Sequence, residues 1–229
     1  MFLIQASGRK RWGLWALLLA TSAYAQSFEA RVKLGVPATP FFDTGAIRGV
    51  HGGTQDSSAT RRYTAGASAE WHLTRSFGFE LDAMYHRLGY TASVTEAGAS
   101  SFASSILHVT GNAWDFPGVV KYRFGRVVRP YAAAGGTLRY IASAQGQGQQ
   151  TSLGFPSDVT TIIHTSSPSD LNKRLYPGVA ASGGLELTIG RVHVLPELRY
   201  TRWTANISGP SGPLRFAPNQ LEFLLGLNL

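Results

Sequence analysis

The chain has 229 residues, no cysteine and a formal net charge of +8, and 44% of its residues are hydrophobic. The lack of cysteine excludes a disulfide scaffold, on which small exported domains often depend. Beyond the first 25 residues, adjacent basic pairs occur only at Arg61–Arg62 and Lys173–Arg174, so the sequence shows no basic stripe for nucleic acid. The length suits one domain.

The first 25 residues have the pattern of a cleaved secretory signal peptide. Three basic residues at 9–11 precede a short apolar run at 12–20 and the small-x-small sequence Ala-Tyr-Ala at 23–25. The apolar run is shorter than the roughly 20 residues that a membrane-spanning helix needs. We therefore expect export, cleavage before Gln26, and a mature domain of residues 26–229 with a net charge of +5 instead of +8.

Alternation of apolar and polar residues predicts eight extended segments in the mature chain, because strand side chains point to opposite faces with a period of two. The segments are residues 27–36, 61–73, 77–90, 112–124, 129–142, 176–189, 192–203 and 216–229. No later apolar run is long enough for a transmembrane helix. The pattern indicates an all-β domain.

The connections between these segments alternate in length. Short connections have the size of tight hairpin turns, whereas the long ones are rich in Gly, Ser, Pro and Thr, which predicts loops. The short ones are residues 74–76, 125–128 and 190–191, and the long ones are residues 37–60, 91–111, 143–175 and 204–215. An even strand number with short turns at one end and long loops at the other is typical of a transmembrane barrel, with the short turns on the periplasmic side.

Parity along each segment separates an apolar face from a charged face. In 77–90, for example, Phe79 and Leu81 fall opposite Glu80 and Asp82. A one-residue slip would exchange the faces, so agreement across the strands indicates one consistent sheet. The charged face carries Glu29, Arg31, Lys33, Glu70, His72, Glu80, Asp82, His86, Asp115, Lys121, Arg123, Arg139, Glu186, Glu197, Arg199 and Glu222.

Two barrels could use this pattern. A soluble periplasmic, lipocalin-like carrier would turn the apolar face inward, and a membrane barrel would turn it toward lipid. The sequence favours the membrane barrel, because the whole chain has four lysines and aromatic residues gather near both strand ends, as at Trp71 and Trp114. We therefore predict an eight-stranded antiparallel up-and-down transmembrane β-barrel, closed by its first and last strands, with an ion-paired, plugged lumen.

At residues 196–203 and 219–229 the chain resembles the small outer-membrane β-barrel family of Gram-negative bacteria, the outer membrane protein beta-barrel domain. The resemblance implies a location in the cell outer membrane, within outer-membrane lipid and lipopolysaccharide. It also implies that the assembly machinery of that membrane reads the closing strand during biogenesis. The residues similar to that signal are Phe223, Leu225, Leu227 and Leu229, of which the last replaces the terminal Phe of most members.

No catalytic, cofactor-binding or metal-binding set stands out. His51, His108, His164 and His193 lack metal-ligand spacing, and the charged-face carboxylates fit an ion-pair network. We expect a monomeric, non-catalytic barrel with a structural or surface-interaction role through its loops. An outer-membrane lipid A hydrolase or acyltransferase is the alternative from another class, for which Ser208 would be a rim hydroxyl without a neighbouring histidine.

Four basic residues near the expected outer rim could contact lipopolysaccharide phosphates. They are Arg61, Arg62, Lys173 and Arg174. Charge-assisted hydrogen bonds to phosphate would give them a binding role, and solvation of the strand ends explains them equally well.

Overall fold

The structure, a computed structural model, is all-β. It describes residues 28–49, 52–98, 101–125, 129–154, 158–165, 175–190, 192–204 and 215–228, and every regular element there is a strand. No helix in these ranges is long and apolar enough to cross a membrane. The expected signal peptide, Lys173, Arg174, Ser208 and Leu229 lie outside the described residues.

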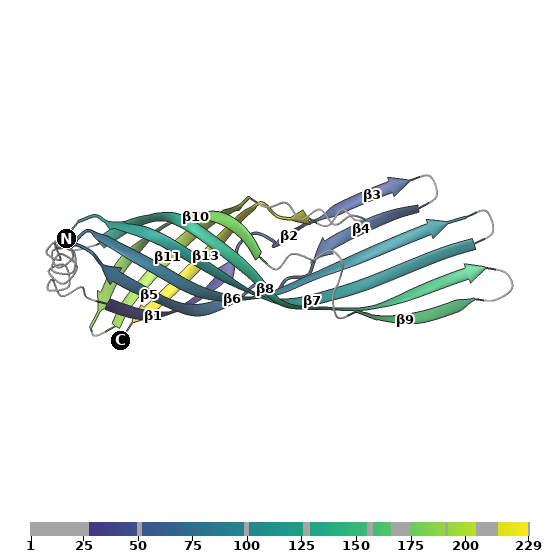
Figure 1. Ribbon diagram of the computed structural model, residues 1–229, viewed down its shortest axis with the longest axis horizontal. Coiled ribbons are helices and arrows are strands. Elements are labelled where there is room, and N and C mark those ends of the chain that lie inside the picture. The colour runs from purple at the N-terminus through teal and green to yellow at the C-terminus, as the bar shows by residue number, and fades with distance from the viewer. Residues whose placement is uncertain are drawn as a thin grey trace, which may run out of the picture.

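Eight strands form a closed antiparallel barrel, as the sequence predicts (Figure 1). Their order around the barrel is β1-β5-β6-β7-β8-β10-β11-β13, and β13 pairs again with β1. The bounds are β1 Phe28–Pro37, β5 Thr64–His72, β6 Phe77–Ala97, β7 Ser101–Arg123, β8 Arg129–Gly154, β10 Leu175–Ile189, β11 Val192–Trp203 and β13 Asn219–Asn228. Both described ends of the chain therefore lie in neighbouring strands.

Closure solves the edge problem of the first and last strands. Val32 lies opposite Leu227, and Val36 opposite Phe223, so β1 and β13 satisfy each other's backbone groups. At the end of the barrel that holds the short connections, Gly125 and Gly190 adopt positive φ values of 79° and 66°. This conformation suits glycine and permits an abrupt change of chain direction.

The exterior of the barrel is apolar and its interior charged, which confirms the predicted parity. Leu34, Leu81 and Phe116 are exposed on the outside, whereas Lys33 and Glu80 are buried inside. Arg139, on the Gly- and Ala-rich strand β8, also points inward and is 1% exposed. The arrangement is the inverse of a soluble carrier, whose apolar face would fill the barrel.

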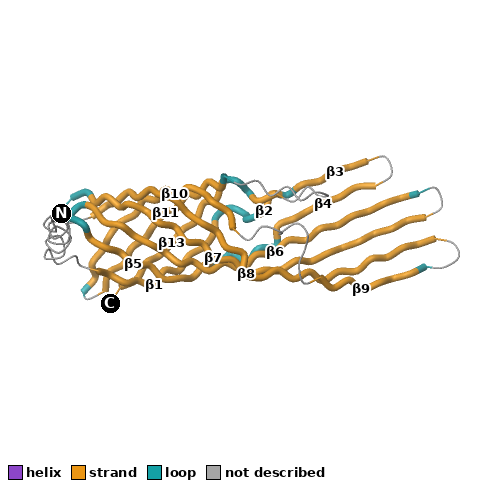
Figure 2. Tube along the Cα trace, in the orientation of Figure 1, coloured by secondary structure: helices purple, strands orange, loops and turns teal. Residues whose placement is uncertain are grey.

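Three barrel strands continue well past the barrel and form a projecting sheet (Figures 1 and 2). β6, β7 and β8 contain 21, 23 and 26 residues, far more than the roughly 9–11 that cross a bilayer. Three further strands widen the sheet, which has the order β3-β4-β6-β7-β8-β9. Their bounds are β3 Gly45–Gly49, β4 Gly52–Ser58 and β9 Val159–Thr165.

The projecting sheet corrects the expectation of long loops at 37–60, 91–111 and 143–175. Much of each segment is strand, because each is folded against a neighbour: Thr54 lies opposite Val94, and Ser105 opposite Gln150. The Gly, Ser, Thr and Gln composition suggested loops, but pairing across a hairpin outweighs weak strand propensity. Most of 204–215 lies outside the described residues.

A short two-stranded ladder lies at the mouth of the barrel. β2 Phe42–Asp43 pairs with β12 Arg215–Phe216, and the backbone N–H of Ala217 donates to the carbonyl of Phe41 at 3.0 Å. Phe41 and Phe42 are almost completely buried as a result. This ladder anchors the start of the predicted loop 37–60 inside the barrel mouth.

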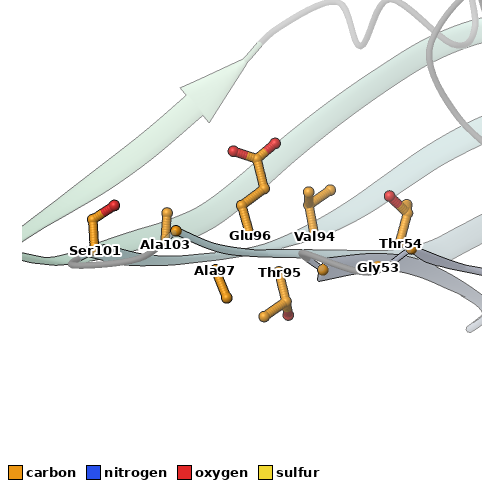
Figure 3. A pocket seen from close by; sticks show the side chains of 11 residues that line it. Gly53, Thr54, Val94, Thr95, Glu96, Ala97, Ser101 and Ala103 are labelled. Carbon is orange, nitrogen blue, oxygen red and sulfur yellow. The ribbon is translucent and has the colours of Figure 1, made fainter.

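An open pocket lies near the tip of the projecting sheet. Its lining includes Thr54, Val94, Thr95 and Glu96. Figure 3 shows Glu96 and Val94 on one side of the strands and Thr95 on the other, as alternation requires. The side chains therefore do not converge on one enclosed space, and we assign no ligand to this pocket.

Candidate functional site

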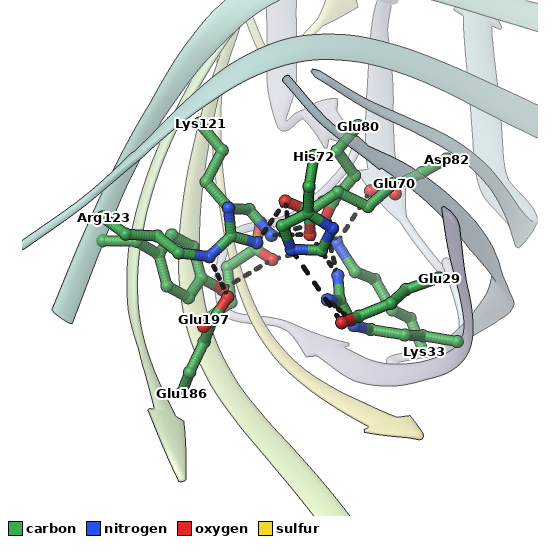
Figure 4. A network of polar contacts seen from close by, with 12 residues as sticks. Glu29, Lys33, Glu70, His72, Glu80, Asp82, Lys121, Arg123, Glu186 and Glu197 are labelled. Atoms are coloured by element: carbon green, nitrogen blue, oxygen red, sulfur yellow. Dashed lines mark hydrogen bonds and ion pairs between the residues drawn. The ribbon is translucent and has the colours of Figure 1, made fainter. Parts of the chain in front are cut away.

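The part of the barrel lumen near the short turns holds a layer of buried ion pairs (Figure 4). Lys33 is central: its Nζ lies 2.6 Å from Glu80 Oε1, 3.0 Å from Asp82 Oδ2 and 3.0 Å from Glu197 Oε2. Lys121 Nζ contacts Glu80 as well and lies 3.2 Å from Glu70 Oε2. Each lysine thus donates to carboxylates from more than one strand.

Three arginines complete this layer. Arg123 Nε donates to Glu186 at 2.6 Å, and its Nη2 contacts Glu70. Arg31 contacts Glu70 and lies 3.3 Å from Glu80, while Arg199 Nη2 lies 2.5 Å from Asp82 and 2.6 Å from Glu197. We call the layer the ion-pair plug; its residues are Glu29, Arg31, Lys33, Glu70, Glu80, Asp82, Lys121, Arg123, Glu186, Glu197 and Arg199.

The ion-pair plug combines charges that would each be costly alone. A buried charge without a partner costs several kcal/mol, but nearly every charge in the plug is within 3.3 Å of an opposite charge. Glu80 is 1% exposed, whereas the side chain of Glu29, at the edge of the plug near the short turns, is 36% exposed. The network is therefore dry at its centre and wet at its margin.

A second polar group lies nearer the mouth, around Arg139. Its Nε and Nη2 each donate to Asp115 at 2.7 Å, and Nη2 also donates to Gln220 Oε1 at 2.9 Å. The guanidinium lies between two rings, 4.3 Å from the centre of Phe41 and 4.1 Å from that of Trp203. Sandwiching of this kind is typical of arginine, whose planar cation is weakly hydrated.

Apolar side chains close the mouth above Arg139. We call this cluster the aromatic cap; its residues are Phe41, Phe42, Leu88, Tyr90, Val109, Ala113, Ile141, Tyr176 and Trp203. The cap unites side chains from β2 and from five of the barrel strands. Phe42 packs edge-on to Tyr90 with 5.3 Å between ring centres. The lumen therefore contains a charged layer and an apolar layer in series.

The described residues bring together no hydrolytic triad. His86 lies 3.1 Å from Asp115 and 3.6 Å from Glu222, but this group contains no hydroxyl. Elsewhere in the described ranges, Thr91 Oγ1 lies 2.9 Å from His108 Nδ1, with no carboxylate against the ring. Within the same ranges, no cluster of three or more His, Asp or Glu side chains suits a metal ion.

The predicted rim arginines are placed in part. Arg61 and Arg62 are exposed at the mouth end of the barrel, just before β5. The backbone N–H of Arg61 donates to the carbonyl of Arg87 at 3.3 Å, and Arg87 Nη1 reaches Asn112 at 3.4 Å. Arg87, on the outward face of β6, therefore joins them as a third rim cation, and its sequence position at the end of an alternating run signals this.

The predicted assembly signal lies on the outside of the closing strand. Phe223 is 58% exposed and Leu225 is 40% exposed, and Leu227 is half-buried on the same face. All three point toward the surroundings of the barrel and none toward the lumen. The apolar stripe is thus continuous on the described part of β13.

Sequence reasoning missed the exposed apolar residues of the projecting sheet. Ile106 is 45% exposed, Val159 53% and Ile162 65%. For Val159 and Ile162 the only signal was a short β-branched run, Val-Thr-Thr-Ile-Ile at 159–163, inside a segment otherwise predicted as a loop. Strand β9, which carries Val159 and Ile162, becomes apparent only from its pairing with β8, and Ile106 lies on the extension of β7.

A closed eight-stranded barrel with an apolar exterior and a charged interior defines the class of transmembrane β-barrels. A model of one family, described as the outer membrane protein beta-barrel domain, matches residues 24–202, and the chain belongs to this family. It is accordingly a β-barrel protein of the cell outer membrane. No curated protein sequence matches it significantly.

Several solved structures have a similar fold. OprG, an outer membrane protein from Pseudomonas aeruginosa, is 12% identical, with a TM-score of 0.44 and coverage of 89% of this chain and 94% of that one. Neisserial surface protein A (NspA) is 12% identical, with a TM-score of 0.35 and coverage of 88% and 97%. Ail, the attachment invasion locus protein of Yersinia pestis, is 11% identical, with a TM-score of 0.32 and coverage of 87% and 96%.

Proposed function

We propose that this protein is a non-catalytic outer-membrane barrel. Its lumen is sealed, and the barrel serves as a rigid support for the projecting sheet. In this proposal the sheet stands at the cell surface and acts by contact with other molecules. The observation that carries it is the combination of two filled lumen layers with a long, partly apolar sheet beyond them. A channel would need an open lumen, whereas a barrel that only supports the projecting sheet does not.

The ion-pair plug and the aromatic cap support the sealed lumen. An eight-stranded barrel is only wide enough for its own side chains. Lys33 and Glu80 are each 1% exposed, and Phe42 in the cap is fully buried, so the centre of each layer is closed to solvent. A solute would have to break several ion pairs and displace the cap in one passage.

Conductance tests the sealed lumen directly. We expect the purified protein to show no steady porin-like conductance in planar bilayers, because two layers obstruct the path. A deletion of residues 38–43, which removes Phe41 and Phe42 from the cap, should leave conductance low because the ion-pair plug remains. Steady conductance of the unaltered protein at porin-like levels would overturn the proposal of a sealed lumen.

Lipopolysaccharide contact by the rim cations is part of the proposal. Arg61 and Arg62 are exposed beside Arg87 at the mouth end, where the outer-leaflet phosphates would lie. Lys173 and Arg174 belong to the same predicted set. The short-turn end of the same strand pair carries Arg75, which is also exposed and would face the other leaflet.

Replacement of both Arg61 and Arg62 by alanine should weaken binding of lipopolysaccharide by about 1 kcal/mol per arginine. Titration of the purified protein in neutral detergent, with intact and with dephosphorylated lipopolysaccharide, measures this effect. Arg75→Ala is the matched control, and it should bind both forms as the unaltered protein does. Equal affinity of the double variant and the control for intact lipopolysaccharide would remove the rim residues from the proposal.

Biogenesis and oligomeric state complete the proposed function. The outward stripe of Phe223, Leu225 and Leu227 supports recognition of the closing strand by the outer-membrane assembly machinery. Leu229 belongs to the same predicted signal. Within its own membrane the protein acts as a monomer, because β1 and β13 close the barrel without a second chain. A lipid A hydrolase is less well supported, since the described residues lack a hydroxyl, imidazole and carboxylate in contact.

A further inference from the structure

The projecting sheet has two lateral edges, formed by β3 and β9. Within the described residues, β3 pairs only with β4, and β9 pairs only with β8. An edge strand presents a row of backbone N–H and C=O groups that can pair with another chain. Proteins usually protect such edges with lysine, proline, bulges or very short strands. The two edges differ in this respect.

β3 is protected and β9 is not. β3 spans only five residues, Gly45–Gly49, begins and ends with glycine, and carries the charged Arg48. β9 spans seven residues, Val159–Thr165, with the sequence Val-Thr-Thr-Ile-Ile-His-Thr, which contains no Lys, Arg, Asp, Glu, Pro or Gly. Ile162, at its centre, is 65% exposed. The chemistry of β9 therefore favours pairing with another strand.

The sequence of β9 is complementary to itself in an antiparallel pair. With a two-fold axis at Ile162, Ile162 lies opposite its own copy, Thr161 lies opposite Ile163, and Val159 lies opposite Thr165. Every opposed pair is β-branched on both sides except Thr160 with His164, and no pair brings like charges together. An isologous contact of this kind is the usual one between two identical chains. The sequence thus fits a second copy.

The direction of the strands determines where that second copy must be. β6, β7, β8 and β9 lie along the long axis of the molecule and extend beyond the barrel (Figure 1), with β6 and β8 running outward and β7 and β9 running back. The two-fold axis of an antiparallel pair is perpendicular to its strands, so it places the two barrels at opposite ends of the pair. Two barrels in one membrane must point the same way. An antiparallel β9 pair therefore joins molecules in two facing membranes.

The projecting sheet is long enough for this contact. The pairing of β8 with β10 ends at Tyr140, and β9 covers β8 from Gly146 to Ser152. At about 3.4 Å per residue, the end of β9 at Thr165 lies about 20 Å beyond the closed barrel, and its start at Val159 lies about 40 Å beyond it. It is thus carried clear of the barrel mouth.

We propose that β9 pairs antiparallel with β9 of a second copy in the outer membrane of a neighbouring cell, and so joins like cells. The inference rests on the proposed function, in which the sheet faces the outside of the cell. One seven-residue edge buries less than the roughly 1,000 Å² expected of a stable interface, so a single contact is weak. Many copies on two surfaces act together, and multivalency then raises the overall strength by about 10²–10⁴.

Cysteine cross-linking tests the register, because the natural chain contains no cysteine. Ile162→Cys places two thiols directly opposite, with Cα atoms about 4.5–5.5 Å apart, within reach of a disulfide. Val159→Cys is the matched control: it is exposed on the same strand, but its two copies would lie about 20 Å apart. Cells that carry the protein with one of two different tags are mixed and mildly oxidised.

We expect a disulfide dimer containing both tags with Ile162→Cys, at least tenfold more abundant than with Val159→Cys. Labelling with a membrane-impermeant maleimide on intact cells tests the proposed function separately: labelled thiols without a mixed-tag dimer would overturn the β9 pairing alone. Unlabelled thiols on intact cells, with folding shown by heat-modifiable mobility, would overturn both. Equal dimer yields for the two variants would also reject the pairing.

A charge exchange provides a second readout. Cells with Ile162→Lys should sediment as slowly as cells without the protein, because the substitution places two like charges opposite each other. Cells with Ile162→Glu should do the same, and a mixture of the two should recover aggregation, with alternating cell types in each cluster. Gln149→Lys, on the neighbouring strand β8 rather than at the edge, is the control that should retain aggregation. No recovery in the mixture would count against the pairing.

Discussion

Replacement of Glu80 by glutamine should lower the free energy of unfolding by about 3–5 kcal/mol. Glu80 accepts from Lys33 at 2.6 Å, contacts Lys121, and lies 3.3 Å from Arg31. The substitution keeps the shape of the side chain but leaves buried cations without a central partner. Urea unfolding in lipid vesicles, followed by tryptophan fluorescence and by heat-modifiable mobility, measures the change.

Glu29→Gln is the matched control for this prediction. Glu29 also contacts Arg31, but its side chain is 36% exposed, so water can replace the lost charge. We expect a loss of at most about 1 kcal/mol. An equal loss of stability in the two variants would contradict the prediction. Burial would then not make the centre of the ion-pair plug more sensitive to substitution than its margin.

Replacement of Leu198 by arginine should cost about 2–4 kcal/mol, because the residue lies in the middle of β11 on the lipid-facing side. Leu198 is 42% exposed on the barrel exterior and lies opposite Phe223 of β13. In a bilayer this exposed fraction meets hydrocarbon, where an arginine is poorly solvated. Unfolding in vesicles compared with the unaltered protein gives the difference.

Ile189→Arg supplies the positional control. Ile189 is 66% exposed at the last position of β10, beside Gly190 of the short turn. At this depth an arginine reaches the interface, and the expected cost is about 0–1 kcal/mol. A larger cost at Ile189 than at Leu198 would contradict the assigned depths of these two residues in the membrane.

Local patterning was sufficient for the barrel itself. Strand parity separated residues such as Leu81 and Phe79 from Glu80 and Asp82, and the structure places the two sets outside and inside the barrel. The assignment depends only on neighbours two residues apart, because the side-chain period of a strand is two. Closure by the first and last strands also followed, since an up-and-down barrel has no other partner for them, and the structure adds the register that places Val32 opposite Leu227.

Strand parity could not predict the strands that extend past the barrel. Residues 146–152 are Gly-Gln-Gly-Gln-Gln-Thr-Ser, a composition typical of loops, yet they pair with β7 on one side and with β9 on the other. Strand formation there depends on hydrogen bonds supplied by neighbours rather than on intrinsic propensity. The edge of β9, on which the cell-contact proposal rests, exists only because β8 covers its other side.

The sequence by itself determined the class of fold, the number of barrel strands and the chemistry of each face, because these depend on alternation along single strands. Only the tertiary structure decided which charges meet. Lys33 and Glu197 are 164 residues apart in sequence, and their Nζ–Oε2 contact of 3.0 Å arises from closure of the barrel. Tertiary pairing likewise turned three expected loops into a projecting sheet, since backbone groups of weakly strand-forming residues are satisfied once a partner strand lies beside them.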